Sequence, residues 1–412
     1  MSKTPEPAGR PLRIGIATDA LYEQIVDGEV RIANGGVGVY VHQLVRHLLT
    51  IDHVNEYFLI RLGEGRLDIY QHPRVRSIFL PRTFRNRAAA VLGGAYSRPV
   101  RDLRLDLVHF PNMFGSGLLR APAKQIATVH DLTPLTLPST HPRNRVIATR
   151  MAIGRAVRRA DRVIVPSKAT ARDLIERRLA PPERIVCIPE GVNPLMRRIS
   201  PTPAFGERYQ INRPFILTVG VLEPRKNHTI LLEVLRRLRK EGHDLELIII
   251  GRPGWRWIDP RANDKYRDLW PWVRILADIP DSDLIEFYSR AELFIYPSWY
   301  EGFGLPLLEA MACGAPAISS SVSSMPEVAG DAALFADPRD AGAFAAQALR
   351  LLCDASLRQK MVDAGIHRAR RFSWRSTAEA TLALYEEVCR PTTPDRATPN
   401  LSGPGIENRI QR

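Results

Sequence analysis

Few cysteines, few aromatic residues and no long apolar run set the first limits on this sequence. Its 412 residues include four cysteines without a C-x-x-C pair, which argues against zinc or redox chemistry and favours free thiols in a reducing compartment. No apolar run approaches the roughly 18 residues that span a bilayer, and the N-terminal residues lack the apolar stretch of a signal peptide. We therefore expect a protein that stays in the cytoplasm.

The positive charge of the sequence is confined to one half. The net charge is +14, and residues 1–200 hold all of the excess, with 31 Lys and Arg against 17 Asp and Glu; the remainder of the chain has 27 of each. Such a charge suits phosphorylated ligands, an anionic membrane or nucleic acid. Nucleic-acid binding predicts aromatic residues among the basic ones, but residues 140–165 contain none, so this alternative is disfavoured.

The composition and the apolar pattern predict two α/β domains. With 45% hydrophobic and 25% charged residues, the chain is an ordinary globular protein too long for one core. Short Ile- and Val-rich runs alternate with amphipathic stretches such as 227–241 and 340–353, the pattern of doubly wound parallel sheets covered by helices on both faces. We expect strands near 12–17, 56–60, 75–80, 106–110, 125–129, 162–166 and 184–188, and again near 215–220, 245–250, 273–277, 293–297, 316–320 and 333–336.

Domain boundaries follow from proline content and from loss of periodicity. The stretch 193–214 has four prolines and little periodicity, so we expect the interdomain linker there. The predicted units are an N-terminal doubly wound α/β domain (11–198), a C-terminal doubly wound α/β domain (212–372), a helix that crosses back to the first domain (373–390), and disordered ends (1–10 and 391–412).

The segment PSWYEGFGLPLLEAMACGAP, residues 297–316, is the strongest candidate site. It follows a predicted strand, and its glycines and Pro306 predict a tight loop and the start of a helix, whose N-terminus favours an anion. Glu301 is expected in the loop and Glu309 in the first helical turn, where both carboxylates could face a vicinal diol. Alternatively, the glutamates only cap the helix and complement its dipole.

A second candidate, TVGVLEPRKNH, spans residues 218–228 at the end of another predicted strand. Arg225 and Lys226 precede Asn227, which is a good N-cap residue. Two cations at a helix N-terminus suggest a diphosphate whose charge is stabilised as it leaves. The alternative is a solvated basic turn.

Two weaker motifs lie in the first half. The run NGGVGVY, residues 34–40, contains Gly36 and permits close approach of a ligand, but it matches no full dinucleotide fingerprint. In TVHDLTPLTLP, His130 and Asp131 end a predicted strand. A neutral His130 could hydrogen-bond a sugar hydroxyl, with Asp131 orienting it or taking a proton from an acceptor, although such a pair is often only structural.

One metal-like motif is discounted. Asp281 and Asp283 form a D-x-D, but DSDLIEFYSRAE predicts a helix with Asp281 or Ser282 as its cap and Asp283 in its first turn. We therefore expect no metal there.

At these motifs the sequence resembles the retaining glycosyltransferases of family 4, which have the GT-B fold of two Rossmann-like domains facing across a cleft. Within the family it is similar to bacterial mannosyltransferases of cell-surface polysaccharide synthesis. The resemblance extends from NGGVGVY through VHD, PSKATARDL, IPEGVNP, VGVLEPRKNH and the Glu301–Glu309 segment to the final FSW helix.

The resemblance implies a role for each matching residue. Arg225 and Lys226 would hold the diphosphate as electrophilic catalysts, Glu309 would bind the nucleotide ribose, and Glu301 would contact the transferred sugar. His130 would face the sugar across the cleft, with Asp131 and Gly36 on the acceptor side. The implied catalytic residues are Glu301, His130, Arg225 and Lys226; the implied donor-binding residues are Gly36, Arg225, Lys226, Glu301, Phe303, Gly304, Leu305 and Glu309.

The resemblance also implies substrates and partners. It predicts a hexosyltransferase that uses GDP-mannose without a metal or other cofactor, acting on a glycan or lipid-linked glycan at the cytoplasmic face of the inner membrane, with peripheral contact to anionic lipid. A UDP-sugar donor, a sugar-nucleotide epimerase, a catalytically inactive homologue and a basic nucleic-acid-binding protein remain the alternatives. No additional acid/base set supports the epimerase.

Overall fold

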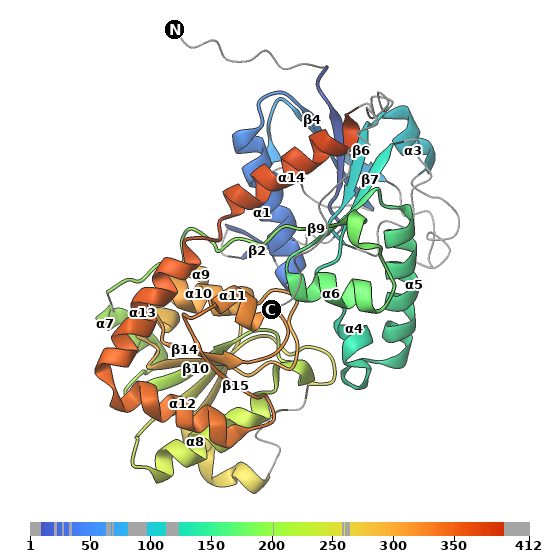
Figure 1. Ribbon diagram of the computed structural model, residues 1–412. Coiled ribbons are helices and arrows are strands. Elements are labelled where there is room, and N and C mark those ends of the chain that lie inside the picture. The colour runs from blue at the N-terminus through green and yellow to red at the C-terminus, as the bar shows by residue number, and fades with distance from the viewer. Residues whose placement is uncertain are drawn as a thin grey trace, which may run out of the picture.

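The computed structural model of the protein describes residues 10–19, 23–26, 29–32, 35–62, 67, 70–80, 97–112, 123–200, 202–257, 259 and 264–390. Within these residues the chain forms two α/β domains joined by two neighbouring crossings (Figure 1). The disorder expected at the two ends of the chain lies outside the described residues, apart from Arg10.

Each domain is built on a parallel sheet. The first sheet has seven strands, in the order β5 (Val75–Leu80), β4 (Glu56–Leu62), β1 (Arg13–Ala17), β6 (Leu107–Phe110), β7 (Lys124–Thr128), β8 (Arg162–Val165) and β9 (Ile185–Cys187). The second has six, in the order β12 (Val273–Leu276), β11 (Glu246–Ile250), β10 (Phe215–Val219), β13 (Leu293–Tyr296), β14 (Ala317–Ser320) and β15 (Leu334–Ala336).

Every strand expected from the sequence is present within two residues of its expected ends, so the prediction of doubly wound domains is confirmed. Runs such as ELIII in β11 are buried along their whole length because helices cover both faces of the sheet. The antiparallel hairpin of β2 (Glu23–Val26) and β3 (Glu29–Ile32) was not expected.

The pleat of the strands divides the C-terminal domain into two apolar layers. Phe215, Leu217 and Val219 of β10 face one layer and Ile216 faces the other. The first face is covered by α7 (Pro203–Tyr209), α9 (Asp281–Arg290), α10 (Leu305–Ala312) and α11 (Met325–Ala329). The second face is covered by α8 (His228–Lys240) and α12 (Ala341–Cys353), and α13 (Ala355–Ala369) contributes to both.

The N-terminal sheet is covered in the same way. On one face lie α1 (Gly35–Ile51) and α14 (Trp374–Cys389); on the other lie α3 (Ser97–Asp102), α5 (Arg143–Arg159) and α6 (Lys168–Glu176), with the short α4 (Thr133–Thr136) packed beside α5.

The two crossings between the domains run side by side. Val192 bridges Ser373, and a Cβ on Gly191 would lie only 2.1 Å from the backbone nitrogen of Trp374, so only glycine fits there. Beyond this point α14, from the segment expected to cross back, packs against α1, with Trp374 and Tyr40 6.0 Å apart between ring centroids.

The expected linker at 193–214 is wrong in part. Helix α7 forms within it, and Phe205 packs at 4.7 Å between ring centroids against Phe287 of α9, so this part of the stretch belongs to the C-terminal core. The prolines of this stretch obscured the helix, although the one within it, Pro203, is tolerated in a first helical turn.

The strand order of the C-terminal sheet fixes the place of a site. The chain runs outward from β10 through β11 to β12, then returns to the other side of β10 with β13. Loops that follow β10 and β13 therefore diverge at the same edge, the point where open α/β sheets bind ligands.

Candidate active site

The two strongest sequence motifs meet at this edge. The loop after β10 contains the short 3-10 helix η4 (Pro224–Lys226), and the loop after β13 precedes α10. The backbone N–H of Trp299 donates to the carbonyl oxygen of Arg225 at 2.8 Å, which joins the two loops directly.

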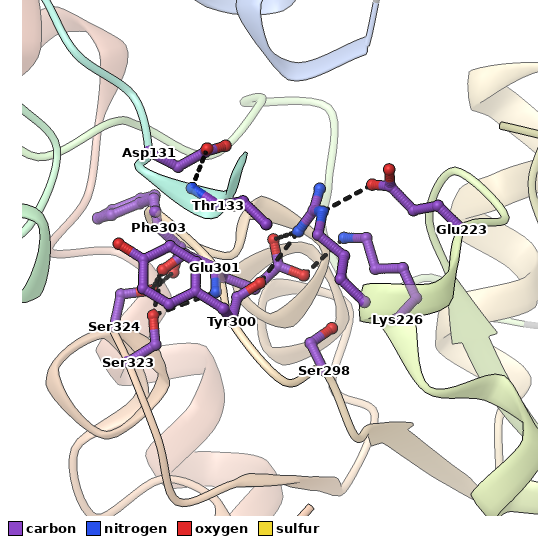
Figure 2. A network of polar contacts seen from close by, with 12 residues as sticks. Asp131, Thr133, Glu223, Lys226, Ser298, Tyr300, Glu301, Phe303, Ser323 and Ser324 are labelled. Atoms are coloured by element: carbon purple, nitrogen blue, oxygen red, sulfur yellow. Dashed lines mark hydrogen bonds and ion pairs between the residues drawn. The ribbon is translucent and has the colours of Figure 1, made fainter. Parts of the chain in front are cut away.

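Glu301 is the centre of the cluster. It is buried, and its Oε1 accepts from Lys226 Nζ at 2.7 Å and from the Tyr296 hydroxyl at 2.9 Å, while its Oε2 accepts from Arg225 Nη1 at 2.6 Å. Figure 2 shows the Glu301 carboxylate directed toward Lys226, with Asp131 of the N-terminal domain above it. Burial opposes ionisation, but the two cations outweigh it and lower the pKa of Glu301 to about 2.

A second carboxylate balances the charges. Glu223 Oε1 lies 2.7 Å from Arg225 Nε, so Arg225 is held between Glu223 and Glu301. Burial raises the pKa of Glu223, and its Oε2 is buried without a hydrogen-bond partner among the described residues. Glu223, Glu301, Arg225 and Lys226 thus form a buried cluster of two negative and two positive groups.

Lys226 reaches this position because of a glycine. It is 6% exposed, and burial followed by the charge of Arg225 lowers its pKa. Gly220 has a φ of +149°, and a Cβ there would lie 3.3 Å from Lys226 Nζ, so a larger residue would be both strained and crowded.

Serines after β14 hold the backbone of the Glu301 loop. Ser323 Oγ accepts from the Glu301 N–H at 3.1 Å, and Ser324 Oγ donates to the carbonyl oxygens of Glu301 and Phe303 at 3.0 and 2.8 Å. These bonds satisfy a loop that has no regular partner, so the position of Glu301 is fixed by its backbone as well as by its charge.

The N-terminal domain contacts this loop through its backbone. A Cβ on Gly302 would lie 1.9 Å from the carbonyl oxygen of His130, so only glycine permits the approach. Ser167 Oγ donates to the Gly302 carbonyl oxygen at 2.6 Å, and the Tyr300 hydroxyl donates to Asp173. The structure therefore brings the His130 segment and the Glu301 loop together.

The expected pairing of His130 with Asp131 is wrong. His130 Nδ1 lies 2.9 Å from Glu190 Oε1, and Nε2 lies 2.9 Å from the carbonyl oxygen of Pro111, whereas Asp131 accepts from the Thr133 N–H at 2.9 Å. Asp131 instead closes a local turn, because a short carboxylate bonds most easily to the N–H two residues on.

The expectation of a neutral His130 is also wrong. A carbonyl oxygen and an ionised carboxylate can only accept, so these partners favour the imidazolium, which donates from both ring nitrogens. Burial lowers the pKa of His130, but the hydrogen bond and charge of Glu190 outweigh it and raise the pKa above its usual value. His130 therefore has no free nitrogen lone pair.

Glu309 lies one turn deeper in α10 than expected. The helix begins at Leu305, which makes Glu309 its fifth residue. Its Oε2 accepts from the Tyr288 hydroxyl at 2.9 Å, and burial raises its pKa to about 7. Among the described residues no hydrogen bond joins Glu309 to Glu301, so a shared ligand is still a prediction.

The other candidate residues have different environments. Gly304, with a φ of +106°, precedes α10, while Leu305 packs against the cores of both domains. Phe303 is buried against Phe372, with ring centroids 5.7 Å apart. Gly36 is exposed in the first turn of α1, and no described atom would lie within 4 Å of its Cβ.

Two capping predictions are corrected. Helix α9 begins at Asp281 after Pro280 without a side-chain cap, so neither Asp281 nor Ser282 caps it, although Asp283 lies in its first turn as expected. Asn227 stands at the N-cap of α8 as expected, with a φ of +56°, but its side chain makes no capping bond; its amide donates to the carbonyl oxygens of Pro297 and Pro338. The described residues contain no group of three or more metal-binding side chains.

Sequence reasoning missed Glu190, Glu223 and Tyr296 as members of this site. Glu223 stands within TVGVLEPRKNH, directly before Pro224, and Tyr296 ends the strand before Glu301. Two buried cations require more than one carboxylate. That requirement was the available signal for Glu223. No sequence signal identified Glu190 beyond its place in IPEGVNP, because its partner His130 is distant in the chain.

Glu301→Gln should destabilise the protein by about 3–5 kcal/mol, because it leaves two buried cations with insufficient negative charge. The folded pKa of about 2 lies below the ordinary 4.5, so the wild-type contribution is present above about pH 4.5 and is lost as the pH falls toward 2. Denaturant unfolding at several pH values measures both effects. Glu379→Gln, which removes an exposed partner of Arg375, is the control and should cost less than about 1 kcal/mol; equal losses would contradict the prediction.

Comparison with known proteins places this geometry in a family. Residues 34–194 match the family described as Glycosyltransferase Family 4, and residues 205–368 match Glycosyl transferases group 1. The chain is 31% identical to O-antigen chain mannosyltransferase B of Escherichia coli, over 85% of this chain and 96% of that protein. It is 30% identical to MMP alpha-(1->4)-mannosyltransferase of Mycolicibacterium hassiacum, over 86% and 95%.

Solved structures share the fold. Sucrose-phosphate synthase from Thermosynechococcus elongatus superposes with a TM-score of 0.72 at 21% identity, covering 92% of this chain and 99% of that one. A search of the described residues identifies no helix long and apolar enough to cross a membrane. With both halves matched, a relative above 30% identity along most of the chain, and the GT-B arrangement of two parallel-sheet domains, the protein belongs to glycosyltransferase family 4 and is a glycosyltransferase.

Proposed function

We propose that the protein is a retaining hexosyltransferase that moves mannose from GDP-mannose to a glycan or lipid-linked glycan acceptor in polysaccharide or glycolipid synthesis. The observation that supports it most is the buried Arg225–Lys226–Glu301 cluster at the sheet's switch point, against the His130 segment of the other domain. The mannose donor is supported by the relatives named as mannosyltransferases.

The cations are placed to act on a leaving diphosphate. Arg225 and Lys226 are nearly excluded from water, where a charge acts more strongly than it does in solvent. Their positions are fixed before any substrate arrives, so little reorganisation is needed as negative charge develops on the diphosphate. We expect no resident metal, because these side chains supply the positive charge.

Glu301 and Glu309 would hold the donor's hydroxyl groups. An ionised carboxylate offers about four acceptor positions, and Glu301 uses three for Lys226, Tyr296 and Arg225, which leaves about one for a sugar hydroxyl. Glu309 accepts one hydrogen bond, from Tyr288, and so has room for both hydroxyls of a ribose.

His130 would act through its position and charge. As an imidazolium it cannot accept the acceptor's proton, so that proton passes to an oxygen of the leaving phosphate. The acceptor oxygen then forms its bond to the anomeric carbon on the face from which the diphosphate departs, which keeps the anomeric configuration. Asp131, beside His130, would lie on the acceptor side.

Calorimetric titration with GDP, UDP and ADP, each with and without a metal chelator, tests the proposal. We expect GDP to bind most tightly and the chelator to have no effect, because contact with the diphosphate is assigned to the side chains of Arg225 and Lys226 and not to a metal. A preference for UDP would keep the mechanism and change the donor. Failure of all three nucleotides to bind would contradict the proposal and favour the basic surface as a nucleic-acid site.

The affinity for GDP should increase from about pH 6 to about pH 8. The pKa of Glu309 is about 7, so at the lower pH its carboxyl is protonated and accepts poorly from the ribose hydroxyls, while at the higher pH it is ionised. Glu309→Gln should bind GDP more weakly and lose most of this pH dependence. If the affinity for GDP increases equally with pH in the wild type and in the variant, Glu309 is not the source of the pH dependence.

We also propose peripheral membrane contact through α5. This helix has six arginines and no acidic residue, and Ile147 and Met151, one turn apart, are 59% and 52% exposed. Its opposite face, with Ile153 and Val157, is buried in the domain. A cationic helix with exposed apolar side chains suits an anionic lipid surface, where a lipid-linked acceptor would be found.

Co-sedimentation with vesicles of phosphatidylglycerol and phosphatidylcholine tests this contact at low and physiological salt. The wild type should bind and respond to the fraction of anionic lipid, and Ile147→Glu should weaken binding about tenfold, because a charge would enter the lipid interface. Ile175→Glu on α6, a 40% exposed position, is the matched control. Indifference to lipid charge, or equal losses in both variants, would contradict the contact.

A further inference from the structure

His141 is a buried polar group with no function in the mechanism above. It is 2% exposed, and neither Nδ1 nor Nε2 has a hydrogen-bond partner among the described residues. Leaving a buried polar ring unpaired is costly, so native structures rarely do it without a ligand, an ion or water. Burial, followed by the charge of Arg145, lowers the pKa of His141 to about 4, which keeps the unliganded ring neutral.

Both domains contribute to the surroundings of His141. Its ring lies 5.1 Å from that of Trp255 between centroids, and the guanidinium carbon of Arg145 lies 4.1 Å from the Trp255 ring centroid. Arg256 Nη1 donates to the carbonyl oxygen of Ser139 at 2.7 Å. The segment before α5 therefore meets the segment after β11 across the domain boundary.

The N-terminus of α5 faces the same region. The helix has 17 residues, its N-cap is Pro142 without a side-chain cap, and its first turn has no acidic residue. Its first N–H groups and its dipole favour an anion. Among the described residues, no ion pair joins Arg143, Arg145 or Arg256 to a carboxylate.

We propose that His141, Arg145, Arg256 and the first turn of α5 form a phosphate-binding subsite between the domains, beside the donor site. Its ligand is a phosphate group, which can accept from a ring N–H, from guanidinium groups and from helix N–H groups together. Trp255 shields one side of the subsite from water. The inference rests on the proposed function only for the source of the phosphate.

Two substrates can supply that phosphate. The charges of Arg225 and Asp131 both act on His141, so the subsite lies on the side of the donor cluster, and the diphosphate of the donor is one candidate source. The other source is a phosphate on the acceptor, bound while the donor occupies Arg225 and Lys226. The shared chemistry is a phosphate accepting hydrogen bonds from His141.

Nuclear magnetic resonance of protein with isotope-labelled histidine tests the subsite directly. His141→Phe removes one of the ten histidines and identifies the ring signal of His141 by its loss. Inorganic pyrophosphate should shift this signal and raise the pKa of His141, because a bound anion favours the imidazolium. A His141 signal that pyrophosphate does not move would overturn the proposal.

Variants distinguish binding from packing. His141→Phe keeps an aromatic ring against Trp255 and removes both nitrogens, so it should fold and bind pyrophosphate about tenfold more weakly, and Arg145→Gln should weaken binding similarly. Arg150→Gln, the same charge change farther along α5, is the matched control and should bind like wild type. Unchanged binding in His141→Phe, or equal losses in Arg145→Gln and Arg150→Gln, would reject the subsite.

GDP separates the two sources and separates this inference from the proposed function. If GDP shifts the His141 signal, the donor's diphosphate fills the subsite. If GDP binds without shifting it, but pyrophosphate shifts it in the GDP-saturated enzyme, the phosphate comes from the acceptor. If pyrophosphate shifts the His141 signal but GDP does not bind, the subsite is retained and the proposed donor is contradicted. If GDP binds but neither GDP nor pyrophosphate shifts the signal, the donor is retained and the subsite is rejected.

Discussion

The rest of the site depends on one constraint, which is that two buried cations share a buried carboxylate. Charges are tolerated away from water only when they are paired and hydrogen-bonded. Arg225 and Lys226 come from the loop after β10, and Glu301 comes from the loop after β13, so charge balance holds these loops together at the switch point. Gly220 leaves space for Lys226, and Ser323 and Ser324 bond the backbone around Glu301. A substitution at Glu301 therefore disturbs both loops, whereas a substitution in an exposed ion pair disturbs only its own surroundings.

The same loop joins the two domains. Gly302 touches the His130 carbonyl oxygen through its backbone, and the chain crosses between domains at Val192 and Ser373. Because the crossings are adjacent, a rotation about them would alter the His130–Gly302 contact, which lies on the loop that also holds Glu301. His130 itself is held by Glu190 and by Pro111, both of the N-terminal domain. Its charge thus belongs to that domain, while the diphosphate cations belong to the other.

The sequence predicted the strands and the fold class, because buried parallel strands are continuous apolar runs. It also placed the PRKN turn and Glu301 each after a predicted strand, where ligands bind in open α/β sheets. It could not predict the partner of His130, since Glu190 is 60 residues away and only the fold brings them together. It could not predict the charge state of His130 for the same reason. Helix α7 was missed because prolines and a short apolar pattern resemble a linker. The roles inferred for Gly36 and Leu305 came from the family resemblance and not from any contact that the sequence could specify.

The net charge of the donor cluster connects this site to the groups around His141. Glu223, Glu301, Arg225 and Lys226 sum to zero, so the cluster alone does not neutralise a diphosphate. One source of positive charge is a proton on Glu223, whose pKa is raised by burial and whose second oxygen is unpaired among the described residues. The other is the N-terminal domain, where the start of α5 has no side-chain cap, Arg145 forms no ion pair with a carboxylate among the described residues, and His141 can take a proton. Because these groups lie on the opposite side of the domain boundary from Lys226, a diphosphate between them would hold the two domains together, and its release would remove that attraction.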